Sequence, residues 1–175
     1  MPTTHTREPD FDVVVVGGGH AALEAALAAA RMGRRVAAVT MSLRHVAEMP
    51  CNPAIGGLAK GQLVREIDAL GGEMGLAIDQ TALQFRMLNT GRGPAVRSPR
   101  AQADKHEYHV RMLSVLSTQS GLTLLRGRVE NIIVVGGRVK GVGLTNGQVI
   151  LSRTAILTTG TFLCGKMHVG DRTWA

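Results

Sequence analysis

The hydrophobic pattern near the beginning of the chain predicts a strand, a helix and a second strand. Residues 11–16 (FDVVVV) form an apolar run that is typical of a buried parallel strand, and a cluster of glycines follows it. The alanine-rich stretch from about His20 to Met32 predicts a helix that ends at Gly33. Residues 35–40 (RVAAVT) predict the next strand. Together these elements indicate the start of a βαβ unit.

Helical patterns dominate the middle of the chain. Residues 41–93 contain a glycine-rich loop, one predicted helix over about 58–70 and little strand character, so we expect a helical insertion between sheet strands. A second helix is expected over about 101–118, with Val110, Leu113 and Leu116 on its apolar face. Residues 122–125 are short and apolar enough to form the next parallel strand.

Beyond residue 127 the pattern becomes that of β-structure. Residues 128–135, 138–144 and 148–152 predict three short strands, joined by turns at Gly136-Gly137 and at Asn146-Gly147. A separate apolar strand is expected over residues 154–158, before Thr159-Gly160-Thr161. This order predicts an α/β fold: a Rossmann-like FAD-binding domain of the two-dinucleotide-binding flavoprotein type, with a helical insertion and an antiparallel β-meander. A domain that binds NAD normally continues with further helix–strand units instead.

The spacing Gly17-x-Gly19-x-x-Ala22 is typical of a turn that holds a pyrophosphate. Gly17 permits the tight turn, Gly19 leaves room for the phosphates, and Ala22 lets the helix pack closely on the strand. A plain structural turn is the alternative. Thr40 stands at the end of the second strand, where an acidic residue usually binds the ribose, so this part of the pattern is not met.

The composition fits one globular domain. The chain has 175 residues, of which 45% are hydrophobic and 19% charged. It shows no apolar run of membrane-spanning length and no signal-peptide core, so we expect a cytoplasmic protein without membrane association. Cys51 and Cys164 are too few for a disulfide framework and too far apart in sequence to indicate a metal site, so no metal is expected.

Basic residues are concentrated in one part of the chain. The formal net charge is +7, and the segment from Arg86 to Arg111 holds six basic residues against Asp104 and Glu107. Such a stripe could bind the phosphates of a nucleic acid, or it could be an ordinary solvated surface, and charge alone leaves both interpretations open. Aromatic residues are only 3% of the chain, which argues against a base-stacking platform.

Several motifs together resemble the glucose-inhibited division protein A (MnmG) family. They are the glycine cluster at 17–19, residues 50–57 (PCNPAIGG), 79–80 (DQ), 93–97 (GPAVR), 100–104 (RAQAD) and 157–163 (LTTGTFL). The resemblance covers about residues 11–170. Residues 1–10 are polar and are expected to form a flexible tail. The resemblance implies a partial FAD-binding domain over 11–170 that is incomplete at its C-terminus, and a divergent end over 171–175. Members of this family carry threonine at the position of Thr40. Within the family, the missing acidic residue therefore does not argue against a dinucleotide site.

The resemblance also implies a function. Members of the family use FAD, NADH and methylene-tetrahydrofolate to add a carboxymethylaminomethyl or aminomethyl group at C5 of the wobble uridine of tRNA. They work with an MnmE-type GTPase and form homodimers. The positions that match the family's cofactor-binding residues are Gly17, Gly18, Gly19, His20, Ala21, Ala22, Val129, Thr159, Gly160 and Thr161.

Cys51 is the candidate catalytic residue. A thiolate in the turn at residues 51–53 could lie beside the reacting uridine, and a nearby positive charge such as Lys60 would favour the thiolate. The alternative is a small side chain that fills a tight loop. Because family members are much longer, the chain is expected to lack regions needed for activity, and a non-catalytic FAD-binding remnant stays open. Two further classes, another FAD-dependent oxidoreductase and a folate-dependent tRNA methyltransferase, stay open as well.

Overall fold

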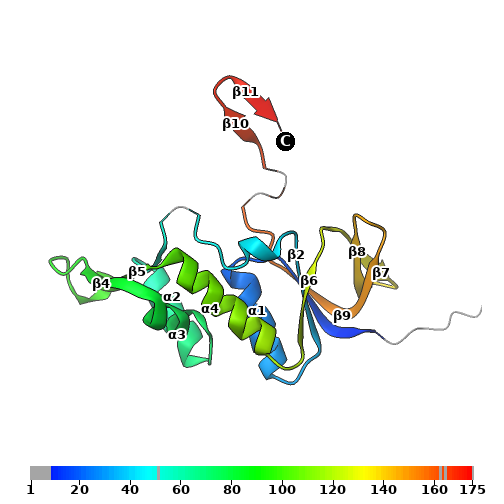
Figure 1. The fold of residues 1–175 in the computed structure, drawn as a ribbon, viewed down its shortest axis with the longest axis horizontal. Coiled ribbons are helices and arrows are strands. Elements are labelled where there is room, and N and C mark those ends of the chain that lie inside the picture. The colour runs from blue at the N-terminus through cyan, green and yellow to red at the C-terminus, as the bar shows by residue number, and fades with distance from the viewer. Residues whose placement is uncertain (1–8, 51, 162, 164, 175) are drawn as a thin grey trace, which may run out of the picture.

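A six-stranded sheet forms the centre of the fold. The computed structural model describes residues 9–50, 52–161, 163 and 165–174. The strands follow the order β6-β2-β1-β9-β8-β7 (Figure 1). Their bounds are β1 Phe11–Val16, β2 Val36–Thr40, β6 Leu122–Arg126, β7 Val129–Val135, β8 Arg138–Leu144 and β9 Val149–Leu157. Strands β6, β2, β1 and β9 are parallel, whereas β8 and β7 are antiparallel, so the expected α/β fold with a β-meander is confirmed.

The two faces of β1 and β2 are buried against different partners. Val15, Val36 and Ala38 pack against the alanines of helix α1, His20–Arg31. Val14, Ala37 and Val39 pack against apolar residues of β8 and β9. Since both faces are covered, these strands are apolar throughout rather than alternating, which is why the sequence revealed them clearly.

The segment between β2 and β6 contains more strand than expected. Helices α2, Lys60–Ala69, and α3, Met74–Thr81, are accompanied by a second sheet of order β3-β5-β4. Its strands are β3 Ala54–Gly56, β4 Ala82–Leu88 and β5 Ser98–Ala103, and all pairings are antiparallel. The expectation of little strand character was wrong because these strands are short or polar, and their hydrogen-bonding partners lie far away in the sequence. Two short 3₁₀-helices, Leu43–His45 and Pro94–Val96, complete this segment.

Helix α4, Lys105–Thr118, begins four residues later than expected. The side chain of Asp104 accepts hydrogen bonds from the backbone N–H groups of His106, at 2.9 Å, and Glu107, at 3.0 Å, and so caps the first turn. The buried face is made of Tyr108, Met112 and Leu116, which are spaced four residues apart. Val110 is instead 46% exposed, so its placement on the apolar face was wrong.

The third meander strand and the final apolar strand are one strand, β9. Its first part pairs antiparallel with β8, with Leu151 opposite Gly141, and from Ser152 onward it pairs parallel with β1. The sequence Ser152-Arg153-Thr154 contains no Gly, Pro, Asn or Asp, and Ser152 pairs with Phe11 of β1, so the polar Arg153 does not interrupt the strand. After β9, a hairpin of β10 Met167–Val169 and β11 Arg172–Trp174 extends across the boundary expected at residue 170.

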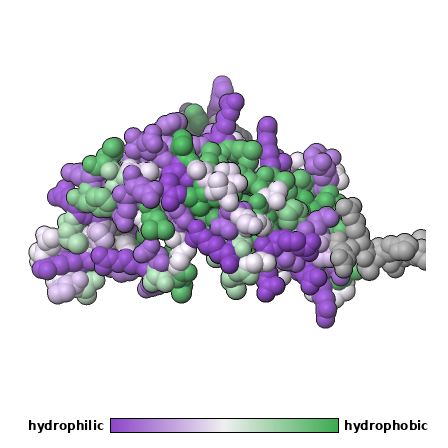
Figure 2. Space-filling view, turned by 60° about the horizontal axis from the view of Figure 1, so that its bottom comes forward, coloured by the Kyte–Doolittle hydropathy of each residue, from purple (hydrophilic) through white to green (hydrophobic). Residues whose placement is uncertain are grey.

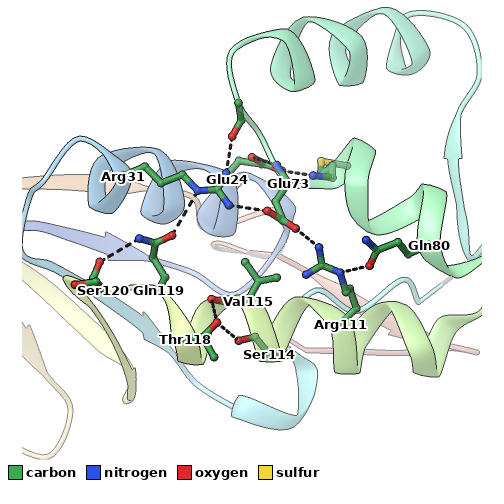
Figure 3. A network of polar contacts seen from close by, with 12 residues as sticks. Glu24, Arg31, Glu73, Gln80, Arg111, Ser114, Val115, Thr118, Gln119 and Ser120 are labelled. Atoms are coloured by element: carbon green, nitrogen blue, oxygen red, sulfur yellow. Dashed lines mark hydrogen bonds and ion pairs between the residues drawn. The ribbon is translucent and has the colours of Figure 1, made fainter.

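A buried carboxylate joins the insertion to the main body (Figure 3). Glu73, directly before α3, accepts from Arg31 of α1 and from Arg111 of α4, each at 2.6 Å, and its side chain is 4% exposed. The carboxylate of Glu24 accepts from the backbone N–H groups of Glu73 and Met74, and it thereby satisfies donors at the start of α3. Three helices are thus tied together by charged groups.

Large apolar side chains also reach the surface. Leu70 is 89% exposed, Leu83 70% and Val135 60%. Figure 2 shows hydrophobic residues interspersed with hydrophilic ones over one face of the molecule. None of the helices in the described part of the chain combines the length and apolar character that crossing a membrane requires.

Candidate dinucleotide-binding site

The glycine loop lies at the edge of the main sheet where its parallel strands end. The loop follows β1, and Thr158 follows β9, the strand beside it. Thr158 donates to the carbonyl oxygen of Val16 through its backbone N–H, at 3.0 Å, and through its hydroxyl, at 2.7 Å. Ligands of open α/β sheets bind at this carboxyl edge, so the two turns meet where a dinucleotide is expected.

Gly17 makes the close approach between these two turns. Its φ of +139° is rarely adopted by residues with a side chain, and its N–H donates to the carbonyl oxygen of Val39 at 2.9 Å. A Cβ at this position would lie 2.3 Å from the hydroxyl oxygen and 2.6 Å from the carbonyl oxygen of Thr158. The tight turn predicted for Gly17 is therefore required by its neighbour as well as by its own backbone.

Gly18 packs against the end of β2. A Cβ on Gly18 would lie 2.5 Å from the hydroxyl oxygen of Thr40. Thr40 is only 7% exposed, and its hydroxyl donates to the carbonyl oxygen of Ser42 at 3.4 Å. The side chain of Thr40 therefore packs against the glycine loop. This contact explains why a small neutral residue stands where other dinucleotide-binding proteins carry an acid.

Gly19 faces open space at the beginning of α1. Its backbone is extended, with φ −82° and ψ 178°, and a Cβ built there would meet no atom within 4 Å. No side chain caps the helix, and within the described residues the N–H groups of Gly19, His20 and Ala21 have no hydrogen-bond acceptor. Free N–H groups at the positive end of a helix attract an anion, so the local geometry suits a phosphate group.

His20 is partly buried at the start of α1. Its Nε2 atom is buried and has no hydrogen-bond partner within the described residues, and the same holds for the hydroxyl of Tyr108. The two ring centroids are 5.6 Å apart. Burial lowers the pKa of His20 below its ordinary value, and the charge of Lys60 lowers the pKa further. Burial, together with Glu24 and Glu73, raises the pKa of Tyr108, so both rings are neutral at pH 7.

We expect His20 to make the folded chain sensitive to mild acid. Below about pH 6.5, His20 takes up a proton more readily in the unfolded chain, so stability is lost as the pH falls from 6.5 toward the lowered pKa of the folded state. His20→Gln should reduce the drop in melting temperature between neutral and acidic buffer. His106→Gln, at an exposed position, should melt as the unaltered chain does. A pH dependence that is identical in all three proteins would contradict this role of burial.

A cavity of about 670 Å³ begins beside the start of α1. Its apolar lining includes Met49, Ile55 and Leu63, and its polar lining includes His20, Glu48, Asn52 and Lys60. The cavity lies between α1, β3 and α2, so the insertion forms one side of it. The volume of this cavity and its mainly apolar lining with a few polar groups are typical of sites that bind small organic molecules or cofactors.

The structure brings together some of the residues singled out in the sequence. Gly17, Gly18 and Gly19 form the loop, His20 and Ala21 line the cavity, and the fully buried Ala22 packs against the sheet. Thr159, Gly160 and Thr161 are exposed and follow β9, with a φ of +69° at Gly160. Val129 begins β7 and packs with the residues buried under the meander. Cys51 lies outside the described residues.

Sequence reasoning missed two contributors to this region. Thr158 fixes the position of Gly17, and Tyr108 lies against His20. The position of Thr158 directly before Thr159-Gly160 could have indicated its role. The second comes from a helix that is distant in sequence, and no local pattern announces the contact. Among the described residues, no group of three or more His, Cys, Asp or Glu side chains is arranged to hold a metal ion.

Comparison with known proteins decides the family. The family model described as glucose inhibited division protein A matches residues 12–175. The chain belongs to the glucose-inhibited division protein A family. It is 57% identical over 163 residues to the tRNA uridine 5-carboxymethylaminomethyl modification enzyme MnmG of Geobacter sulfurreducens, which covers 93% of this chain and 26% of that protein. It is 56% identical over 162 residues to the enzyme of the same name from Lactiplantibacillus plantarum.

Solved structures of a GidA protein and of a GidA-related protein agree with this fold. GidA of Aquifex aeolicus, in its form I crystal, superimposes with a TM-score of 0.89 at 54% identity, over 94% of this chain and 27% of that one. The GidA-related protein of Thermus thermophilus superimposes with a TM-score of 0.63 at 21% identity, over 93% of this chain and 59% of that one, which shows the fold alone. The fold is thus a Rossmann-like FAD-binding domain, and the chain spans about a quarter of the length of its MnmG relatives.

Proposed function

We propose that this chain is the FAD-binding part of an enzyme that modifies tRNA at C5 of the wobble uridine with a carboxymethylaminomethyl or aminomethyl group. The observation that carries the proposal is the open space over Gly19 beside free N–H groups, in a chain of the glucose-inhibited division protein A family. The relatives named above carry the corresponding tRNA modification in their names. Residues 11–170 are proposed as the FAD-binding unit.

The residues of the loop fit the diphosphate of FAD. Gly17 and Gly18 leave no room for a side chain on the protein side, whereas Gly19 leaves room on the open side. The N–H groups at the start of α1 would donate to the phosphate oxygens. Thr159, Gly160 and Thr161 would approach the cofactor from the end of β9, and the backbone of Val129 would meet the adenine.

The cavity beside α1 is the proposed place of the flavin ring. Lys60 lines the cavity together with Glu24 and Glu48, which are already paired with backbone N–H groups and with Lys105. Lys60 would therefore be available to a negative charge on the contents, while the neutral His20 would offer a hydrogen bond without adding charge. The apolar residues around them would exclude water. When bound, FAD would supply the redox and one-carbon chemistry that side chains lack. Cys51 is retained as the candidate nucleophile because it directly precedes Asn52, which lines the cavity.

The remaining proposals concern the complete enzyme. It would use NADH and methylene-tetrahydrofolate, cooperate with an MnmE-type GTPase, act as a homodimer and work in the cytoplasm. The similarity of this chain to MnmG enzymes supports these proposals through the family alone, because the chain spans about a quarter of those relatives.

The cofactor site is tested by Gly19→Asp. The new side chain would enter open space, so the fold should be retained, while its carboxylate would occupy and repel the proposed diphosphate position. We expect the affinity of the purified chain for FAD to fall at least about tenfold, about 1.4 kcal/mol. Quenching of flavin fluorescence on titration with protein measures the affinity.

Gly91→Asp provides the matched control. Gly91 also has open space around its Cβ position and carries no positive φ, but it lies in the loop between β4 and β5. This variant should bind FAD as the unaltered chain does, and neither variant should lower the melting temperature. Undiminished FAD affinity in Gly19→Asp would show that the diphosphate is not at this loop.

A further inference from the structure

The hairpin of β4 and β5 carries an unusual concentration of positive charge. Residues 82–103, here called the arginine arm, contain four arginines and neither aspartate nor glutamate. The arm lies at the opposite end of the molecule from the β7–β8 hairpin (Figure 1). Arg86, Arg92 and Arg97 are exposed, and Arg100 is half-buried. No acidic residue within the arginine arm neutralises these positive charges.

Two of these arginines are direct neighbours across the strands. Arg86 stands opposite Arg100 in the β4–β5 pairing. Opposite residues in antiparallel strands project from the same face with Cβ atoms about 5 Å apart, and like charges placed in this way destabilise a sheet. Among the described residues, no carboxylate forms an ion pair with either guanidinium. The fold therefore holds two cations together without a partner, which is the arrangement that an anionic ligand would stabilise.

The arginine pair is connected to the cavity through β3. Gly56 stands opposite Arg100 on the other side of β5, and Ala54 stands opposite Gln102. Ala54, Ile55 and Gly56 all line the cavity of about 670 Å³, so the cavity lies along the free edge of β3. Since neighbouring strands are about 4.8 Å apart, Arg100 is one strand and Arg86 two strands away from the cavity wall. The pair thus stands beside the proposed flavin site.

The other face of this sheet turns toward the helices of the insertion. Ile55 and Ala101, neighbours across β3 and β5, are buried. Phe85, opposite Ala101, lines a second cavity of about 310 Å³ with residues of α2 and α3. The aromatic ring therefore lies on the face away from Arg86 and Arg100. The arginine face offers charge and hydrogen-bond donors without a platform for stacking bases.

We infer that Arg86 and Arg100 bind the phosphate backbone of an RNA beside the cavity proposed for the flavin ring. The inference deepens the proposed function and rests on it, since it takes RNA as the substrate. Guanidinium groups match phosphate through paired hydrogen bonds, and two of them on one flat surface can contact adjacent phosphates. Contacts of this type position a nucleic acid without reading its sequence. Arg92 and Arg97 extend the same charge toward the tip of the arm.

The test is the salt dependence of RNA binding by the purified chain, measured by fluorescence anisotropy with a labelled RNA stem–loop. Arg86→Gln/Arg100→Gln should weaken binding at least about tenfold at low salt. Loss of two contacts to a single strand should reduce the slope of log affinity against log salt by about 1.4. The charge-matched control is Arg138→Gln/Lys140→Gln, at two exposed positions of β8. This control should keep the affinity and slope of the unaltered chain.

The outcomes separate this inference from the cofactor proposal. RNA binding that is unchanged in the arm variant, equally weakened in the β8 variant, or absent in the unaltered chain would overturn the inference. A loss of FAD affinity in the arm variant with RNA binding intact would also overturn it, because the pair would then serve the cofactor. FAD binding should be the same in all three proteins. Failure of the unaltered chain to bind FAD would instead contradict the proposed function. The inference would still be decided by the difference in RNA affinity and salt slope between the two double variants.

Discussion

Gly17→Ala is expected to destabilise the chain by about 4 kcal/mol and to abolish FAD binding. The φ of +139° is unfavourable for alanine by about 1–3 kcal/mol. The added Cβ would also overlap the hydroxyl and the carbonyl oxygen of Thr158, and overpacking of this kind costs about 1–3 kcal/mol. Thr158 is bonded to Val16 through both its N–H and its hydroxyl, so it cannot move away without breaking the contact between β1 and β9. Urea denaturation followed by circular dichroism measures the change.

Gly19→Ala is the matched control for this prediction. It lies two residues away in the same loop, has an ordinary φ of −82° and faces open space. Its unfolding free energy should remain within about 0.5 kcal/mol of the original value. If the two alanine variants unfold at the same urea concentration, the close contact with Thr158 does not constrain the loop.

The opening of the fold was predictable because local signals and tertiary structure agree there. Buried parallel strands are apolar at every position, the glycine spacing marks the turn between β1 and α1, and the Gly-Gly and Asn-Gly pairs mark the hairpins. The β1–α1–β2 unit, the parallel strand β6 and the meander turns were confirmed. The loop geometry at Gly17 followed from the same motif, because a dinucleotide-binding turn requires it.

The insertion was harder to predict because distant contacts shape it. Strand β5 contains Ser98, Pro99 and Arg100, and only its pairing with β3 and β4 makes it a strand. The start of α4 was expected near Ala101, but Asp104 caps the first turn and the helix begins at Lys105. The proximity of Arg86 and Arg100 depends on strand register, which no local pattern reveals. The assignment of individual cofactor-binding residues remains a prediction from the resemblance.

Glu73 illustrates the same limit, since its side-chain partners come from two separate helices, α1 and α4. Its two carboxylate oxygens each accept from a different arginine, and Arg111 also donates to Gln80 of α3 at 2.6 Å. Arg31 donates in addition to the carbonyl oxygen of Gly71 and, at 3.4 Å, to Gln119 (Figure 3). A single glutamate in a loop gives no signal of this in the sequence. In the structure it is the point at which α1, α3 and α4 are joined.

Glu73→Ala is expected to destabilise the chain by about 3 kcal/mol. Removing one member of a buried ion pair costs about 3–5 kcal/mol, because the remaining charge is left without its partner. Here the lower end applies, since the side chains of Arg31 and Arg111 are 34% and 26% exposed and can turn partly toward water. The midpoint of urea denaturation should fall, and amide hydrogen exchange should accelerate most in α3, which loses the two ion pairs that join its start to α1 and α4.

Two further variants separate charge from packing. Glu73→Gln keeps the shape and can still accept one hydrogen bond, so its loss of stability should be smaller than that of Glu73→Ala. Glu130→Ala, at an exposed position of β7, should change the unfolding free energy by no more than about 0.5 kcal/mol. If Glu73→Ala and Glu130→Ala unfold alike, the two arginines do not depend on this carboxylate. In that case the insertion is held to the main body by apolar contacts among α1, α3 and α4 alone.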